Sequence, residues 1–181
     1  MNTLILDTSR KPAFFALDNE VALIDGKTLS KTFLPALKEK LDTREKPARI
    51  AVGIGPGSYV GTRNGVTIGK ALSYGWNIPL ISFPSPLAFL PDREGCFAYI
   101  GDAKMGEFFV ITGNSDLTNI SAAQLITKDD LPLITTDKDY IISEKPLSLG
   151  ELSPMLNLPV LEKYLEKNLT SAKSVEICYL R

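Results

Sequence analysis

The residues that could do chemistry are few, because the 181-residue chain contains no histidine. Histidine is the usual general base near neutral pH and the commonest metal ligand, so Ser-His-Asp, Cys-His and histidine-bound zinc sites are excluded. Among the carboxylates, Asp7 ends a short apolar run, and Asp102 and Glu107 flank a charged turn. Carboxylates can hold magnesium or act as an acid–base pair, but nothing in the sequence places Asp102 beside Glu107. Asp7-Thr8-Ser9 is also typical of a strand-end turn.

A glycine-rich segment, residues 52–65, lies between a predicted strand and a predicted helix. A loop at this place can bind phosphate at the N-terminus of the helix. The segment matches neither the P-loop nor the G-x-G-x-x-G pattern, and Pro56 has no N–H to offer a phosphate. The alternatives are a rigid turn and a Rossmann-like nucleotide site over Gly53 to Gly61. Pro56 and the three short strands at the start of the chain count against the Rossmann-like site.

The helix predicted over residues 59–74 carries a ridge of small residues. Gly61, Gly65 and Gly69 recur every four residues and therefore share one face. Three glycines cost a helix about 2–3 kcal/mol relative to alanine. Close approach of another backbone would offset that cost, and it comes either from this chain or from a partner's helix. Arg63 and Lys70 flank the ridge, either as solvated charges or as contacts at the rim of an interface.

The elements that position these residues follow from the apolar pattern. Three short runs at residues 4–6, 13–17 and 21–24 predict an antiparallel meander. Leu29, Phe33, Leu37 and Leu41 fall at spacings of four and predict a helix over 29–41. Pro35 would then lie in the first turn of a shorter helix. Strands at 50–54 and 79–82 complete an order typical of one lobe of an actin-like α/β fold.

The second half of the chain follows a shift in composition. Pro84, Pro86 and Pro91 indicate a boundary, which gives a first lobe over 1–83 and a smaller second lobe over 95–181. The elements expected in the second lobe are strands at 97–100, 108–112 and 140–143, a turn at 101–104 and a helix over 159–167.

Bulk composition excludes several classes of protein. The net charge of −1 argues against a protein that holds nucleic acid by itself, since such binding comes mostly from lysine and arginine on phosphates. Cys96 and Cys178 form neither a metal motif nor a disulfide framework, so we expect a reducing cytoplasm. The N-terminal sequence predicts no signal peptide, and no apolar run approaches the ~18 residues of a membrane helix.

Five segments together resemble the TsaB family, which takes part in tRNA threonylcarbamoyladenosine formation. The matching segments are residues 4–9, 34–41, 55–72, 102–107 and 179–181. The resemblance implies an α/β, actin-like (ASKHA, ribonuclease H-like) fold of two lobes with a shortened second lobe. It also implies a non-catalytic scaffold or activating subunit without a cofactor or metal of its own.

The resemblance further implies a set of partners. These are a TsaD-type catalytic subunit, a TsaE-type ATPase in a ternary complex, a second copy when the chain is alone, and tRNA only through the complex. The helices of the first lobe would form the interface. The residues expected there are Phe33, Leu37, Gly61, Arg63, Gly65, Gly69 and Lys70.

The chain departs from the family pattern in three places. Leu29 stands where many members have histidine, Lys104 replaces the usual arginine, and the second half is short. An alternative function is a small actin-like Mg-ATPase or kinase that uses Asp7 and Asp102. The missing glycine-rich phosphate turn after Asp7 and the small second lobe count against this alternative.

Overall fold

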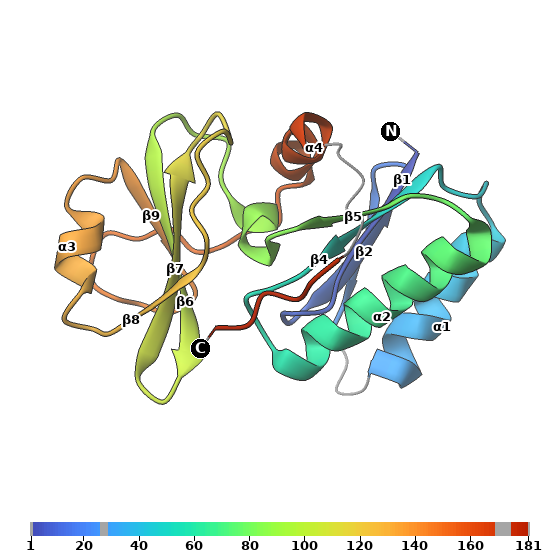
Figure 1. Ribbon diagram of the computed structural model, residues 1–181, viewed down its shortest axis with the longest axis horizontal. Coiled ribbons are helices and arrows are strands. Elements are labelled where there is room, and N and C mark those ends of the chain that lie inside the picture. The colour runs from blue at the N-terminus through green and yellow to red at the C-terminus, as the bar shows by residue number, and fades with distance from the viewer. Residues whose placement is uncertain (1, 26–28, 169–174, 181) are drawn as a thin grey trace. The chain divides into compact units, whose positions relative to one another are not determined.

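The computed structural model describes residues 2–25, 29–168 and 175–180. These residues form two compact units, and the chain passes from the first to the second between Ser85 and Pro86 (Figure 1). Residues 175–177 belong to the first unit and residues 178–180 to the second. None of the helices described is long and apolar enough to cross a membrane.

The first unit is built on a five-stranded sheet in the order β3-β2-β1-β4-β5. The three N-terminal strands pair antiparallel, which confirms the predicted meander, whereas β4 and β5 continue the sheet in parallel. Asp18 and Asn19 close the β2–β3 hairpin with φ angles of 51° and 64°, as a two-residue turn requires. The elements of this unit are β1 (Thr3–Asp7), β2 (Ala13–Leu17), β3 (Glu20–Ile24), α1 (Leu29–Asp42), β4 (Arg49–Gly53), α2 (Tyr59–Trp76) and β5 (Leu80–Phe83).

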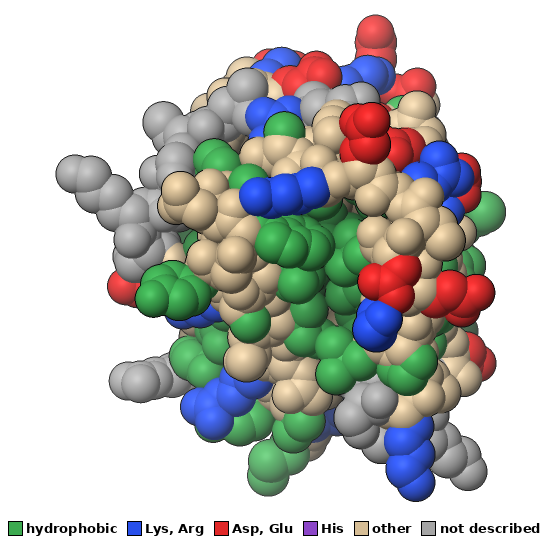
Figure 2. All heavy atoms as spheres, turned by 90° about the vertical axis from the view of Figure 1, so that its right-hand side faces the viewer, with side chains coloured by type: hydrophobic (Ala, Val, Ile, Leu, Met, Phe, Trp, Pro, Cys, Tyr) green, Lys and Arg blue, Asp and Glu red, His purple; other side chains and the backbone are tan. Residues whose placement is uncertain are grey.

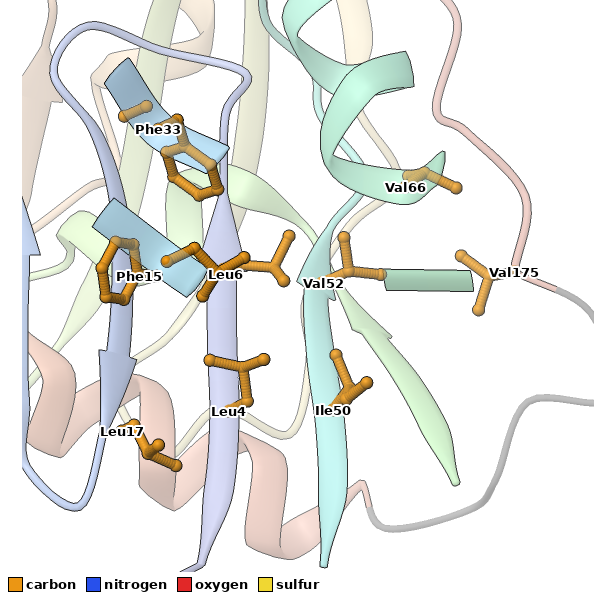
Figure 3. Packing of buried hydrophobic residues seen from close by; sticks show 11 residues of the cluster. Leu4, Leu6, Phe15, Leu17, Phe33, Ile50, Val52, Val66 and Val175 are labelled. Atoms are coloured by element: carbon orange, nitrogen blue, oxygen red, sulfur yellow. The ribbon is translucent and has the colours of Figure 1, made fainter. Parts of the chain in front are cut away.

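Helices α1 and α2 lie on the same side of this sheet (Figure 1). Their inner side chains share one hydrophobic core with alternate residues of the strands, because successive strand residues point to opposite faces. Phe33 of α1 packs edge to face on Phe15 of β2, with ring centroids 5.5 Å apart. Val66 of α2 joins Leu6 and Val52 in the same core (Figure 3). One side of each helix is therefore buried against the sheet of its own unit.

Helix α1 corrects one expectation about Pro35. The helix runs over the whole of Leu29–Asp42, so Pro35 lies in its interior and not in its first turn. Pro35 and Lys31 are both exposed, and the carbonyl of Lys31, which loses its helical donor, can be bonded by water. The predicted apolar stripe holds for Phe33, Leu37 and the half-buried Leu41, while the side chain of Leu29 lies outside the described part.

The second unit is built on a four-stranded sheet in the order β8-β7-β6-β9. The predicted strands and the C-terminal helix are present, but the turn predicted at 101–104 lies instead at Met105 and Gly106, where both φ angles are positive. One face of the sheet packs on Val160 of α4, and the other packs on Leu131 of α3. The elements are a short 3₁₀ turn (Ser85–Phe89), β6 (Cys96–Lys104), β7 (Glu107–Asn114), β8 (Gln124–Ile126), α3 (Leu131–Thr135), β9 (Tyr140–Ser143) and α4 (Leu158–Lys167).

The two sheets repeat one plan. Each has three antiparallel strands, and its fourth strand then pairs parallel beside its first. In the first sheet, β5 pairs with the fourth strand, β4. In the second sheet, the fourth strand, β9, has only a single bridge there, from Ile142 to Leu152. The second unit is thus a shortened version of the first, as the sequence predicted for an actin-like fold.

Candidate protein-protein interface

The N-terminus of α2 is held by the turn that follows β1. The hydroxyl of Ser58 accepts a hydrogen bond from the Gly61 amide at 3.3 Å and caps the helix. The Ser58 amide donates to the Ser9 carbonyl at 2.7 Å. The hydroxyl of Thr8 donates to the Gly61 carbonyl at 2.6 Å. These bonds fix which side of α2 faces the sheet.

The glycine ridge of α2 lies on the side that faces this unit's own sheet. Gly61, Gly65 and Gly69 are all buried. An ideal Cβ on Gly61 would overlap the Thr8 carbonyl oxygen, and one on Gly65 would lie 2.6 Å from the Thr8 hydroxyl. The expectation that a partner's helix lies against these glycines is therefore wrong, because the close approach that they allow is made by the chain itself.

The prediction that Phe33 and Leu37 of α1 lie at the interface is also wrong, because both side chains face the inside of their own unit. Their side chains are 0% and 3% exposed and belong to the core beneath the helix. A partner at the surface of α1 cannot reach them. The periodicity identified these two residues correctly as one face of a helix, but that face is internal.

Arg63 and Lys70 are exposed and lie on the opposite side of α2 from the glycines. Val60, Arg63, Thr67, Lys70 and Tyr74 follow one another at alternating spacings of three and four, and all are exposed. Such spacing places them on a single helical face. Tyr74 is 91% exposed and Val60 is 64% exposed, at opposite ends of this row.

Helix α1 adds to this surface. Leu34, which the sequence placed beside the buried stripe, is 42% exposed. Figure 2 shows hydrophobic side chains gathered on this side of the molecule, with charged side chains around them. We call this surface the α1–α2 face. It consists of Leu34, Tyr59, Val60, Arg63, Thr67, Lys70, Ala71 and Tyr74.

Most residues of the α1–α2 face were missed by the sequence analysis. Val60 and Tyr74 lie at helical spacing from Arg63 and Lys70, and this was the signal that could have found them. The glycine spacing was the more conspicuous pattern, and it drew the prediction to the wrong side of the helix.

The loop before α2 is a rigid turn. The Gly55 amide donates to the Ser85 hydroxyl at 2.9 Å, and the Gly55 carbonyl accepts from the Ser85 amide at 2.9 Å. The Ser58 amide is already bonded to Ser9. The backbone amides of Gly55 and Ser58 are thus used within the fold and do not point at a phosphate. This geometry favours the structural interpretation of the glycine-rich segment over a nucleotide site.

Asp7 is enclosed at the end of β1. Its side chain is 2% exposed, and one carboxylate oxygen accepts from the Ser9 amide at 2.7 Å. An ideal Cβ on Gly53 would overlap the other oxygen. Burial raises the pKa of Asp7, and hydrogen bonds from Ser85 and Ser9 oppose that rise. The Asp7 carboxylate is therefore enclosed by Gly53 and Ser9 of its own unit.

Asp102 is bound by lysines of its own unit. Lys104 and Lys145 each place their ammonium nitrogen 2.8 Å from the same carboxylate oxygen. Hydrogen bonds from Lys104 and then Lys145 hold the pKa of Asp102 well below its usual range. Among the described residues no group of three or more acidic or cysteine side chains could hold a metal ion.

Comparison with known proteins gives consistent matches. A family model described as "TsaD: tRNA N6-adenosine threonylcarbamoyltransferase" matches residues 27–124. The tRNA threonylcarbamoyladenosine biosynthesis protein TsaB of Bacillus subtilis (strain 168) is 30% identical over 153 residues, covering 74% of this chain. The chain spans 63% of the length of that relative.

Two solved structures from Pseudomonas aeruginosa share the fold. An uncharacterized protein with similarity to peptidase YEAZ aligns with a TM-score of 0.74 at 17% identity, covering 99% of both chains. YeaZ aligns with a TM-score of 0.68 at 18% identity, covering 92% of this chain and 93% of the other.

The repeated sheet plan and these neighbours define the class as an actin-like α/β fold of two lobes. The family model covers more than half of the chain, and the chain belongs to the TsaD family, in which its relatives mark it as a TsaB-like (YeaZ-like) member.

Proposed function

We propose that the chain is a non-catalytic scaffold or activating subunit in tRNA threonylcarbamoyladenosine formation. It binds a TsaD-type catalytic subunit through the α1–α2 face. The observation that carries this proposal is the exposure of Tyr59, Val60 and Tyr74 on α2 and of Leu34 on α1, in a chain whose curated relative is named for this biosynthesis. A helix with one side in the core and a second apolar side in water has the pattern of a helix-packing interface.

The state of the acidic residues supports a non-catalytic role. Asp7 is enclosed by Gly53 and Ser9, and Asp102 is paired with two lysines. General acid–base or magnesium chemistry needs groups that can reach a substrate. The transfer chemistry accordingly belongs to the catalytic subunit, and this chain uses no cofactor of its own.

The remaining partners follow from the same assignment. A TsaE-type ATPase joins the two subunits in a ternary complex. The chain reaches tRNA only through this complex, and the complex acts in the cytoplasm. The partner-binding helices lie in the first unit, Met1–Ser85, to which residues 175–177 also belong. The predicted lobes, 1–83 and 95–181, are corrected in this respect, because the second unit begins at Pro86 and residues 175–177 return to the first unit. When the chain is alone, a second copy uses the α1–α2 face.

Adding bulk on the α1–α2 face tests this proposal. Ala71 is exposed on α2, and arginine is a good helix former, so Ala71→Arg should fold normally. We expect its affinity for a TsaD-type subunit, measured by isothermal titration calorimetry, to fall by about 100-fold, or ~2.7 kcal/mol. Threonylcarbamoylation of tRNA by the reconstituted proteins should fall with it.

The second unit offers a matched control. Ala122 is also exposed, and Ala122→Arg makes the same change outside the α1–α2 face. This control should bind as the unmodified chain does. Equal affinities for the two arginine variants would contradict the proposed interface. Tight binding of Mg-ATP by the chain alone would contradict the non-catalytic role.

A further inference from the structure

Two residues of the turn after β1, Thr8 and Ser9, fill the space that the glycines beside them leave open. Thr8 is 4% exposed and Ser9 is 2% exposed. Ideal Cβ atoms on Gly61 and Gly65 would lie 2.1 Å from the Thr8 carbonyl oxygen and 2.6 Å from the Thr8 hydroxyl. One on Gly57 would lie 2.7 Å from the Ser9 carbonyl oxygen. This turn therefore lies directly against the backbone of α2 and of the loop before it.

The Thr8 hydroxyl makes the contact with α2 that depends most on position. It donates to the Gly61 carbonyl at 2.6 Å. A hydrogen bond weakens steeply when its length or direction changes, so this bond tolerates little movement of the carbonyl. Gly61 lies in the first turn of α2. The hydroxyl therefore sets the distance between the end of β1 and the first turns of this helix.

The α1–α2 face depends on this distance, because its two helices are positioned on different strands. Phe33 places α1 against Phe15 of β2. Thr8 places α2 beside the end of β1, and β1 pairs with β2 in the sheet. The position of Leu34 on α1 relative to Val60 on α2 is therefore set through the sheet and through Thr8. A partner that packs on both helices meets a surface with this fixed shape.

We propose that Thr8 is a positioning residue for partner binding, whose hydroxyl holds α2 where the α1–α2 face fits the catalytic subunit. The inference rests on the proposed function, because the surface that Thr8 positions is the one assigned to the TsaD-type subunit. Thr8 is buried against the inner side of α2, so it acts on the partner through this helix. Binding sites need their contacting groups held to within about 0.5 Å, so a small displacement of α2 weakens the complex.

Thr8→Val displaces α2 while it keeps the shape of the side chain. A methyl carbon needs about 3.3–3.6 Å from a carbonyl oxygen, whereas the Thr8 hydroxyl lies 2.6 Å from the Gly61 carbonyl. The first turns of α2 therefore move outward by about 0.7–1 Å. We expect affinity for the TsaD-type subunit, measured by isothermal titration calorimetry, to fall by about 10-fold.

Thr8→Ser separates positioning from stability. Serine keeps a hydroxyl that can donate to the Gly61 carbonyl, but it leaves out a buried methyl group. Urea unfolding should show that Thr8→Ser and Thr8→Val are both less stable than the unmodified chain. Thr8→Ser should nevertheless bind within threefold of the unmodified chain. If affinity falls equally in both variants, Thr8 has a structural role alone and the inference is overturned.

A matched change in the second unit controls for the loss of a hydroxyl group. The Thr135 hydroxyl donates to the Leu131 carbonyl at 2.8 Å, so Thr135→Val removes the same kind of bond outside the α1–α2 face. This control should bind within twofold of the unmodified chain. A tenfold loss of affinity here would show that binding follows any such change, and it would overturn the inference.

The position of α2 can also be tested in the chain alone. Amide hydrogen exchange over residues 59–69 should be faster in Thr8→Val than in the unmodified chain, because the first turns of α2 lose their fixed contact with β1. Thr8→Ser should exchange at close to the rate of the unmodified chain. Equal exchange in all three proteins would overturn the inference, whatever the partner does.

The outcomes separate this inference from the proposed function. If the unmodified chain fails to bind the TsaD-type subunit at micromolar concentration, the proposed function is wrong, and the part of the inference that concerns the partner falls with it. If the unmodified chain binds and Thr8→Val binds within threefold, the positioning role is wrong and the proposed function stands.

Discussion

At the scale of single residues, Asp7 is a carboxylate enclosed within its own unit. Its side chain is buried, and burial is the main reason for its raised pKa. The folded protein therefore keeps the Asp7 proton over a pH range in which the unfolded chain has lost it. The contribution of Asp7 to stability is greatest below the ordinary carboxyl pKa and declines as the pH rises through the raised value.

Replacing Asp7 with asparagine should reveal this dependence. The amide oxygen of asparagine can still accept the hydrogen bond from the Ser9 amide, and the side chain no longer titrates. We expect Asp7→Asn to gain stability relative to the unmodified chain as the pH rises from 4 to 8. Urea unfolding at several pH values measures the difference. If the two proteins keep a constant difference in unfolding free energy, Asp7 is not protonated as described.

At the scale of elements, one side of α2 packs on its own sheet and the other side is exposed. Its glycines allow it to approach β1 and the turn after β1, and its other side is apolar and basic in water. A helix packed this closely on a strand tolerates no side chain at the contact. The loss of helix propensity at the glycines is offset by that packing.

Two glycines of α2 make a matched test of this close approach. An ideal Cβ on Gly61 would overlap the Thr8 carbonyl, whereas one on Gly75 would meet no atom within 4 Å. We expect Gly61→Ala to lower the unfolding free energy by about 2–3 kcal/mol through overpacking. Gly75→Ala should raise it by about 0.5–1 kcal/mol, because alanine favours the helix. Urea denaturation measures both changes. Equal effects would contradict the packing described for α2.

The sequence predicted the elements of the first unit well, because their apolar spacing is regular. It could not decide which side of α2 is internal. Glycine spacing shows that something approaches closely, but it carries no information on whether the approaching atoms belong to Thr8 or to another chain. In the second unit, the hairpin turn was predicted at 101–104 because these residues follow the apolar run at 97–100. The strand continues instead to Lys104, and the turn lies at Met105 and Gly106.

At the scale of the whole molecule, the two units repeat one sheet plan, and the second is the smaller. The α1–α2 face lies entirely on the first unit, so the proposed interface uses no side chain of the second unit. The account predicts that one side of one unit carries the affinity for the catalytic subunit.

Site-specific photo-crosslinking tests this central claim most directly. A photoreactive amino acid is placed at Tyr74, which is 91% exposed on α2, or at Leu133, which is 83% exposed on α3. Each variant is then mixed with a TsaD-type catalytic subunit and irradiated. The account predicts a covalent product from position 74 and none from position 133. Crosslinking from position 133 with none from position 74 would contradict it.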